Sequence, residues 1–180
     1  VRMLPIAKDT LPSLACAFDL AEGADLIVTI GGASVGDHDL VAQAAEGHGL
    51  ERSFYKIAMR PGKPLMAGRM GHAVLLGLPG NPVSAIVCGH LFMLPMLRAM
   101  QGMPGRAPQR DEATLAEDLG PNGPREHYMR AILTQGANGP TIRAYSRQDS
   151  AILSILAEAN ALLVRPIGDG PRSAGQVVEY

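Results

Sequence analysis

The stretch of residues 26–39 places glycines and carboxylates directly after a short apolar run. Its glycines are Gly31, Gly32 and Gly36, and its carboxylates are Asp37 and Asp39. Glycine lets the backbone turn sharply, and successive N–H groups beside a helix N-terminus form a concavity for phosphate. A carboxylate there can cap the helix or hold a hard cation. An ordinary strand–turn–helix connection explains the same residues equally well, so both interpretations stay open.

A second stretch, residues 56–63, carries the cations Lys56, Arg60 and Lys63 around a proline. Proline stiffens such a turn and holds positive charge in a fixed place at little entropic cost, which suits the binding of an oxyanion. A solvated basic turn is the simpler interpretation, and these residues alone favour it.

A third stretch has two prolines and two glycines within residues 77–82 and leads into an apolar helical pattern over 83–100. A rigid turn before a helix N-terminus is a further candidate site for an anion or a nucleotide. Ser84 falls in the first turn of the predicted helix, where it could cap the helix or contact a ligand. Pro95 predicts a kink or a break in this helix.

The elements around these stretches alternate between helix and strand. Strands are predicted over 1–7, 26–30, 53–59, 65–67 and 72–76, and helices over 10–23 and 40–47. This alternation is typical of an α/β domain with a parallel sheet, and the last two strands are predicted to form a hairpin. In such sheets, ligands bind outside the carboxyl ends of the strands, where Asp9 and the glycine loop would both lie.

The composition argues against several classes of function. A net charge of −1 over 180 residues, with 4% aromatic residues and no Trp, gives no expected partner surface for nucleic acid or for an anionic membrane. No apolar run approaches the roughly 20 residues of a membrane span. The five histidines lack ligand spacing, so a histidine-based zinc site is not expected. Cys16 and Cys88 are predicted to be buried free thiols of a cytoplasmic protein.

The composition changes after residues 101–108, and we place a domain boundary there. Short strands are predicted over 113–119, 127–134, 141–145, 161–165 and 176–180, with a helix over 152–159. This pattern predicts a small β-barrel-like domain. Its residues Arg130 and Ser150 are, from the sequence alone, a solvated strand position and a helix cap.

Taken together and in this order, the three stretches closely resemble the MoeA family, the molybdopterin molybdenumtransferases related to the E domain of gephyrin. The tail at 149–162 and 175–178 resembles the same family. The glycine loop is also similar to the MogA and MoaB types, whereas the Pro-Gly-Lys-Pro turn and the tail point to MoeA. The resemblance implies a partial, mostly parallel MogA-like α/β molybdopterin-binding domain with flanking helices over 1–103. It also implies the MoeA β-barrel-like domain IV over 104–180.

The resemblance also implies a reaction, the insertion of molybdate into adenylylated molybdopterin with Mg²⁺ and release of AMP. The metal ligands would be Asp9 and Asp39, with Asp37 as a weaker candidate. The catalytic residues would be Asp39, Lys56, Arg60 and Lys63. The substrate-binding residues would be Gly31, Gly32, Ser34, Gly36, Pro79, Pro82, Ser84, Arg130 and Ser150. Arg60 stands where lysine is common in the family, which keeps the charge and changes the donor geometry.

Members of the family carry further domains ahead of the part that resembles this chain, so a C-terminal piece with an incomplete sheet and an exposed edge is expected. The resemblance implies a homodimer in the full-length protein and a MogA-type adenylyltransferase as a partner. Two other functions stay open: adenylyl transfer to molybdopterin, and a binding or scaffold role for a piece that lacks the other domains.

Overall fold

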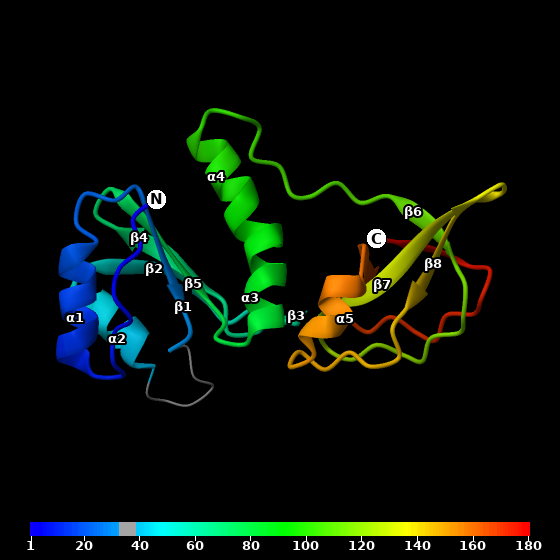
Figure 1. The fold of residues 1–180 in the computed structure, drawn as a ribbon, viewed down its shortest axis with the longest axis horizontal. Coiled ribbons are helices and arrows are strands. Elements are labelled where there is room, and N and C mark those ends of the chain that lie inside the picture. Colours follow the sequence, from blue (N-terminus) through cyan, green and yellow to red (C-terminus); the bar gives the residue numbers. More distant parts are fainter. Residues whose placement is uncertain (33–38) are drawn as a thin grey trace. The chain divides into compact units, whose positions relative to one another are not determined.

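The computed structural model describes residues 1–32 and 39–180 (Figure 1). By its contacts the chain divides into two units. Unit 1 comprises residues 1–57 and 62–81, and unit 2 comprises residues 58–61 and 82–180. Each unit has its own hydrophobic core.

Unit 1 is a four-stranded sheet with two helices. Its elements are α1 (Leu11–Leu20), β1 (Leu26–Ile30), α2 (Leu40–Gly47), β2 (Leu50–Tyr55), β4 (Met66–Met70) and β5 (Ala73–Leu78). The strand order is β1-β5-β4-β2. The predicted hairpin is confirmed, because β4 and β5 pair antiparallel across Gly71.

Within the described part of this sheet, the parallel pairing that the sequence predicts is found between β1 and β5 alone. The pairs β4–β5 and β2–β4 are antiparallel, because short connections bring each next strand back alongside the previous one. Residues 1–7 lie outside the strands of this sheet, contrary to the expectation for them. Consequently β1 is at one end of the strand order, and its residue Ile30 is 70% exposed.

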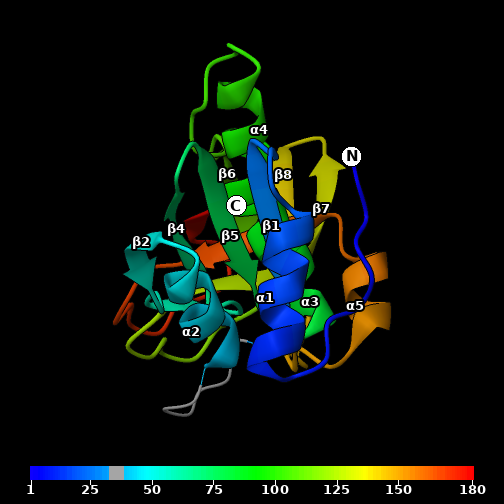
Figure 2. The same ribbon diagram turned by 90° about the vertical axis from the view of Figure 1, so that its left-hand side faces the viewer.

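The two helices cover one face of this sheet (Figure 2). Leu14 and Phe18 of α1 and Val41 and Ala45 of α2 share a core with Leu75 of β5. Burying such apolar side chains is the main stabilising contribution to a small unit of this kind. Both helices begin at the end of the sheet where β1 and β5 finish (Figure 1).

Unit 2 contains a second sheet and the long apolar helix. Its elements are β3 (Met59–Arg60), α3 (Pro82–Cys88), η1 (Gly89–Met93), α4 (Leu94–Met100), β6 (Glu112–Leu115), β7 (Glu126–Gly136), β8 (Gly139–Ala144), α5 (Leu153–Glu158), β9 (Ala161–Arg165) and β10 (Val177–Glu179). The sheet order is β10-β6-β8-β7-β3, and β9 also pairs with β7. The five strands and the helix predicted after residue 108 are therefore present.

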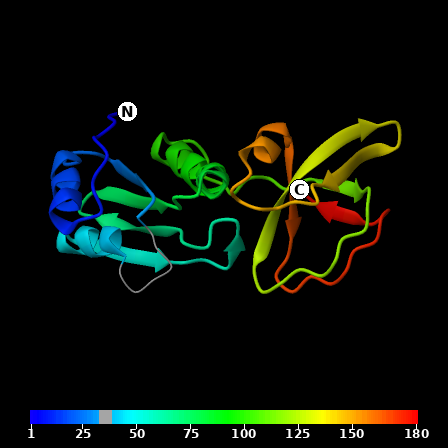
Figure 3. The ribbon, with the colours of Figure 1, turned by 60° about the horizontal axis from the view of Figure 1, so that its bottom comes forward.

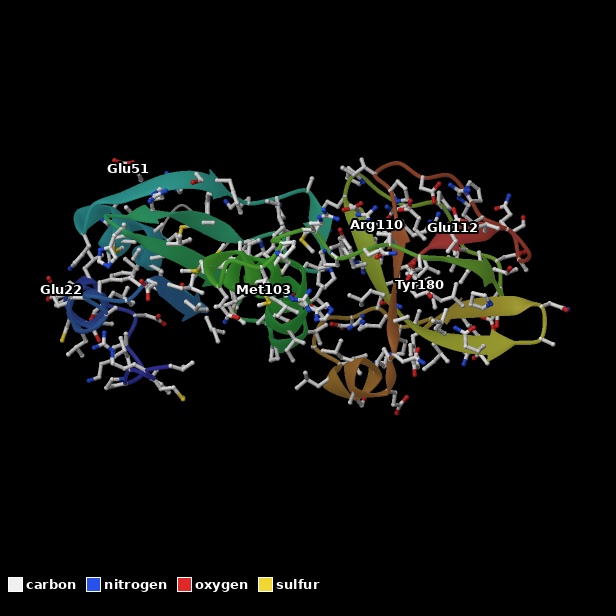
Figure 4. All side chains as sticks on the ribbon, turned by 90° about the horizontal axis from the view of Figure 1, so that it is seen from above. Glu22, Glu51, Met103, Arg110, Glu112 and Tyr180 are labelled. Carbon is white, nitrogen blue, oxygen red and sulfur yellow. The ribbon has the colours of Figure 1, made fainter. Side chains whose placement is uncertain are left out.

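The long strand β7 organises this sheet, and Figure 3 shows its hairpin with β8 in yellow. Its first residues pair with β3 and β9, and its last residues pair with β8. Arg110, labelled in Figure 4, links two strands of the sheet through ion pairs with Glu126 of β7 (2.9 Å) and Glu179 of β10 (3.0 Å).

The helical run Pro82–Met100 is interrupted by the π-helical turn η1 just before Pro95. Proline lacks the N–H that an α-helix needs, which explains the irregular turn and confirms the expected break. The expectation about apolar runs needs correction here. These 19 residues are long and apolar enough, by length and composition, to cross a membrane, although the buried core helices of other proteins pass the same test.

Two further expectations differ from the structure. The predicted strand 53–59 is divided: β2 ends at Tyr55, and β3 belongs to the sheet of unit 2. The reason is the backbone of Lys56, whose φ of 66° is incompatible with a continuing strand. Cys88 is a buried free thiol as predicted, whereas Cys16 is free and exposed on the outer side of α1.

Candidate functional site

The glycines that follow β1 meet the turn that follows β5. Gly31 and Gly32 have φ values of 87° and 73°, which only glycine adopts without strain. The N–H of Gly31 donates to the carbonyl oxygen of Leu78 at 3.1 Å. A Cβ on Gly80 would lie 3.1 Å from the Cα of Gly31, so the two backbones pass in close contact. The first and third stretches therefore meet at the carboxyl ends of β1 and β5.

The remaining predicted residues of the glycine loop, Ser34, Gly36 and Asp37, lie outside the described residues. Gly32 closes the described part of the loop against α2, because a Cβ on it would collide with the side chain of Val41.

Asp39 is the N-cap of α2. Its Oδ1 accepts a hydrogen bond of 2.9 Å from the N–H of Ala42. Its Oδ2 is buried and has no hydrogen-bond partner among the residues that the structure describes. A buried carboxylate oxygen without a donor is costly, and a cation is one means of satisfying it.

Tyr55 is the last residue of β2 and directly precedes Lys56, the first residue of the cationic turn. Burial raises the pKa of Tyr55 above its ordinary value, and the hydrogen bond with Asp39 and the charge of Asp39 add to this, while Arg52 opposes it. The ammonium of Lys56 lies 4.7 Å from the centroid of the Tyr55 ring, and the guanidinium of Arg52 lies at 5.4 Å. The sequence interpretation missed Tyr55. Its position directly before Lys56, at the end of a strand, was the available signal.

The cationic turn is closed by backbone hydrogen bonds. The N–H of Lys56 donates to Leu65 at 2.9 Å, that of Ile57 to Lys63 at 3.0 Å, and that of Leu65 to Gly62 at 3.1 Å. Lys56 and Lys63 are both exposed. A rigid backbone with two exposed ammonium groups can hold an anion without first ordering a loop.

The third cation, Arg60, belongs to unit 2. It is exposed in β3, where it pairs in register with His127 of β7. Burial lowers the pKa of His127 to about 4, and the nearby charges of Arg60 and Arg130 add to the effect. The imidazole is therefore neutral at physiological pH and adds no positive charge beside Arg60.

Arg130 is buried and fully engaged. Its Nε and Nη2 donate to Oε1 of Gln148 at 3.2 and 3.1 Å, and its Nη1 donates to the carbonyl of Asp149 at 2.9 Å. Burial lowers the pKa of Arg130 from its ordinary value, and the charge of Asp149 opposes this. The expected solvated strand position is wrong, because Arg130 anchors the loop before Ser150. Ser150 itself is half-buried and lies three residues before α5, whose N-cap is Ile152, so the expected helix-cap position of Ser150 is wrong.

The other predicted residues lie at helix starts and turns. Pro79 is buried after β5, Pro82 is the exposed first residue of α3, and Ser84 is buried in the first turn of α3. Asp9 is exposed two residues before α1. Among the described residues, no three His, Cys, Asp or Glu side chains gather closely enough to hold a metal by themselves.

Within unit 1, the structure thus brings Gly31 and Gly32, Asp39, Lys56 and Pro79 to the region where β1, β2 and β5 end and α2 begins. The predicted residues Arg60, Pro82, Ser84, Arg130 and Ser150 belong to unit 2. Glycine N–H groups, a carboxylate with an unsatisfied oxygen and fixed ammonium groups suit a ligand that carries phosphate together with a divalent cation.

Comparison with known proteins agrees with this chemistry. Residues 1–99 match a family described as a probable molybdopterin binding domain, and residues 112–180 match the MoeA C-terminal region, domain IV. The chain is 40% identical over 154 residues to molybdopterin molybdenumtransferase 2 of Mycobacterium tuberculosis H37Rv, covering 81% of the chain and 37% of the relative. It is 32% identical over 173 residues to molybdopterin molybdenumtransferase of Staphylococcus aureus COL, covering 96% of the chain and 41% of the relative.

Solved structures share the fold. The MoeA protein of Pyrococcus horikosii matches with a TM-score of 0.75 and 24% identity, covering 96% of this chain and 41% of that one. A molybdenum cofactor biosynthesis protein of Pyrococcus furiosus matches with a TM-score of 0.68 and 21% identity, covering 95% of this chain and 54% of that one. The chain spans only about two fifths of the length of the two transferases above (37% and 41%).

Proposed function

Because this chain belongs to the MoeA family of molybdopterin molybdenumtransferases, we propose that it contributes to inserting molybdate into adenylylated molybdopterin, with release of AMP. The observation that carries the proposal is the meeting of the Gly31 loop, Asp39 and Lys56 at one end of the sheet of unit 1. Molybdate and the pyrophosphate linkage are both anions. A site for them needs N–H donors, fixed cations and a metal that hold them close together.

Mg²⁺ fits this site, since Asp39 presents a buried carboxylate oxygen without a donor among the described residues. We assign Asp39 and Asp9 as its protein ligands, with Asp37 as a further candidate. Mg²⁺ commonly takes one or two carboxylates and completes its shell with water and phosphate oxygens, so two suffice. When bound, the ion would neutralise phosphate charge and hold the leaving AMP in place.

The chain's own residues have separate tasks in this proposal. The backbone at Gly31 and Gly32 cradles the phosphate of the pterin substrate, with Ser34 and Gly36 continuing the loop. Lys56 and Lys63 hold molybdate and the pyrophosphate. Their charges are already fixed by the closed turn, so little reorganisation is needed when negative charge shifts toward the leaving group.

The remaining assignments follow from the resemblance to the family. Arg60 is assigned as a further cation for the substrate, and Pro79, Pro82 and Ser84 are assigned to shape the turn that leads into α3. Because the Arg130 guanidinium is occupied by Gln148 and Asp149, we assign it the task of holding the loop that presents Ser150. We place the functional boundary between the molybdopterin domain (1–103) and domain IV (104–180). The family matches, which end at residue 99 and resume at 112, support it.

We further propose that the full-length protein is a cytoplasmic homodimer that receives adenylylated molybdopterin from a MogA-type adenylyltransferase. A substrate with an activated phosphate linkage must come from an adenylyl-transfer reaction, which supports such a supplier.

The test is release of AMP from adenylylated molybdopterin by the purified protein with Mg²⁺, with and without molybdate. We expect release to depend on molybdate. We also expect Lys63→Ala to lower the rate about 10- to 100-fold, as for other groups that stabilise developing negative charge. Arg69→Ala, which removes an exposed cation from β4, is the matched control and should leave the rate unchanged. Release of pyrophosphate from ATP and molybdopterin without molybdate would point to adenylyl transfer and overturn the proposal.

A further inference from the structure

Three residues of unit 2 lie in register across three adjacent strands of its sheet. His127 of β7 pairs with Arg60 of β3 on one side and with Arg165 of β9 on the other. Residues that pair directly across strands project their side chains from the same face of a sheet. The imidazole of His127 is therefore flanked on that face by two arginine side chains.

The imidazole of His127 has no partner within the described part of the chain. His127 is only 7% exposed, and its ring forms no hydrogen bond or ion pair with any residue that the structure describes. Burial, together with the neighbouring arginine charges, lowers its pKa to about 4, so the ring is neutral at physiological pH and keeps one N–H donor. Buried polar groups normally have a partner, and a ligand is one means of supplying it.

The two flanking arginines differ in what they contact. Arg165 is buried, and its guanidinium donates to the carboxylate of Asp169 and to the carbonyl oxygens of Gly120 and Gly170. Both oxygens of Asp169 also accept hydrogen bonds from Arg172, so this carboxylate is neutralised. Arg165 and Asp169 therefore form a fixed structural pair that adds little net charge.

Arg60 is exposed and forms no ion pair with any described residue. Its charge is thus available to an anion that approaches from the β3 side. A cation supplies attraction, and a neutral N–H beside it supplies direction without adding repulsion between like charges. A tetrahedral oxyanion has several oxygens and accepts hydrogen bonds from both groups at once.

We propose that the imidazole of His127 donates a hydrogen bond to a tetrahedral oxyanion whose charge is held by Arg60. The inference rests on the proposed function and deepens it, because it adds a neutral donor to the cations assigned to the substrates. Molybdate and the phosphate of the adenylylated pterin share this chemistry, and the experiment distinguishes between them.

The test compares His127→Phe and His127→Gln in the purified protein. Phe retains a planar ring and removes the donor, whereas Gln retains an N–H donor and removes the ring. Calorimetry measures the binding of molybdate alone and, separately, of AMP with Mg²⁺. We expect His127→Phe to weaken the binding of the recognised anion about 10- to 100-fold, the usual effect of losing a hydrogen bond to a charged group. His127→Gln should restore most of the affinity.

The anion that is affected identifies the ligand. A loss for molybdate alone assigns His127 to molybdate, a loss for AMP alone assigns it to the phosphate, and a loss for both indicates one site that either anion occupies. His90→Phe removes an exposed imidazole from η1 of the same unit and is the matched control. It should change neither affinity.

A role of His127 in packing alone predicts the opposite order of the two variants. A buried apolar Phe is tolerated better than a buried Gln whose amide has no partner. If His127→Phe binds both anions like the parent, or if His127→Gln binds them no more tightly than His127→Phe, the inference is overturned.

Arg60→Ala separates the inference from the proposed function. If Arg60→Ala loses anion binding while His127→Phe binds like the parent, the inference about His127 is wrong and the assignment of Arg60 stands. If Arg60→Ala binds both anions like the parent, or if the parent binds neither, the inference is overturned. The proposed function is then still judged by the molybdate-dependent release of AMP.

Discussion

The backbone N–H of Gly31 donates a hydrogen bond of 3.1 Å to the carbonyl oxygen of Leu78, and this bond joins the loops that follow β1 and β5. The register of the parallel pair places Ile30 opposite Leu78, so the bond continues the ladder by one residue beyond β1. The glycine loop and the proline turn are thereby positioned by the sheet itself. Substitutions in either loop should therefore change both the stability of unit 1 and the binding of the proposed substrate.

Replacing Gly32 with Ala should destabilise unit 1 by about 2 kcal/mol or more, since the position combines a φ of 73° with a collision against Val41. Gly71→Ala shares the positive φ but meets open space, and should cost about 1 kcal/mol. Gly47→Ala, at the end of α2 and also in open space, should be neutral or stabilising by up to about 1 kcal/mol. Urea unfolding ranks the three variants, and an unaffected Gly32→Ala would contradict the described packing.

Asp39 combines a capping and a metal-binding task that two substitutions should separate. Asn retains an oxygen that accepts from Ala42, so Asp39→Asn should preserve stability within roughly 0.5 kcal/mol, while Asp39→Ala should lose about 1 kcal/mol with the cap. Both variants should lose Mg²⁺ binding, because both lack the carboxylate charge. Thermal unfolding and calorimetry measure the two effects independently. Parental Mg²⁺ affinity in Asp39→Asn would remove Asp39 from the ligand set.

Gln148 satisfies the buried Arg130 through a single oxygen, Oε1. Gln148→Ala leaves a buried guanidinium without this acceptor and should destabilise unit 2 by about 3 kcal/mol. The control is Arg143→Ala, which breaks only a 3.9 Å contact between half-exposed groups and should cost less than about 0.5 kcal/mol. The two variants are compared by the denaturant concentration at the midpoint of unfolding, provided that both unfold with the same m-value. Equal stability of the two variants would rule out the anchoring role of Arg130.

His127 should make stability depend on pH. Burial, together with Arg60 and Arg130, lowers the pKa of His127 from its ordinary 6.5 to about 4 in the folded protein. Between these values the unfolded chain binds more protons, so stability falls as the pH falls. The contribution is complete above pH 6.5, is lost by about pH 4, and amounts to roughly 3 kcal/mol at most.

The measurement is the free energy of unfolding at pH 7.5 and at pH 4.5 for the parent and for His127→Gln. The variant should show a smaller difference between the two pH values. Hydrogen bonds from Arg172, followed by those from Arg165, hold the pKa of Asp169 below its ordinary 3.8, so that carboxylate loses its contribution only at lower pH. If the free energy of unfolding of the variant depends on pH as that of the parent does, His127 is not the cause of the pH dependence.

Much of the local structure follows from the sequence, because it depends on neighbours a few residues apart. The apolar run before Gly31, the hairpin around Gly71 and the irregular helix at Pro95 are each set by side-chain size, backbone freedom or a missing N–H within one short segment. The three stretches also allowed the family to be identified from the sequence, because each motif consists of residues that are close together along the chain.

Only the tertiary structure decided which of those residues share a site. Gly31 and Leu78 lie far apart in the sequence and are joined only because β1 pairs with β5, and no local pattern encodes that pairing. Arg60 is three residues from Lys63 yet belongs to the other sheet, since the Lys56 backbone ends β2 and lets β3 pair with β7. Arg130 resembles a surface cation in the sequence, and burial beside Gln148 makes it an anchor. Long-range packing sets partners and burial, and these decide what a polar side chain can do.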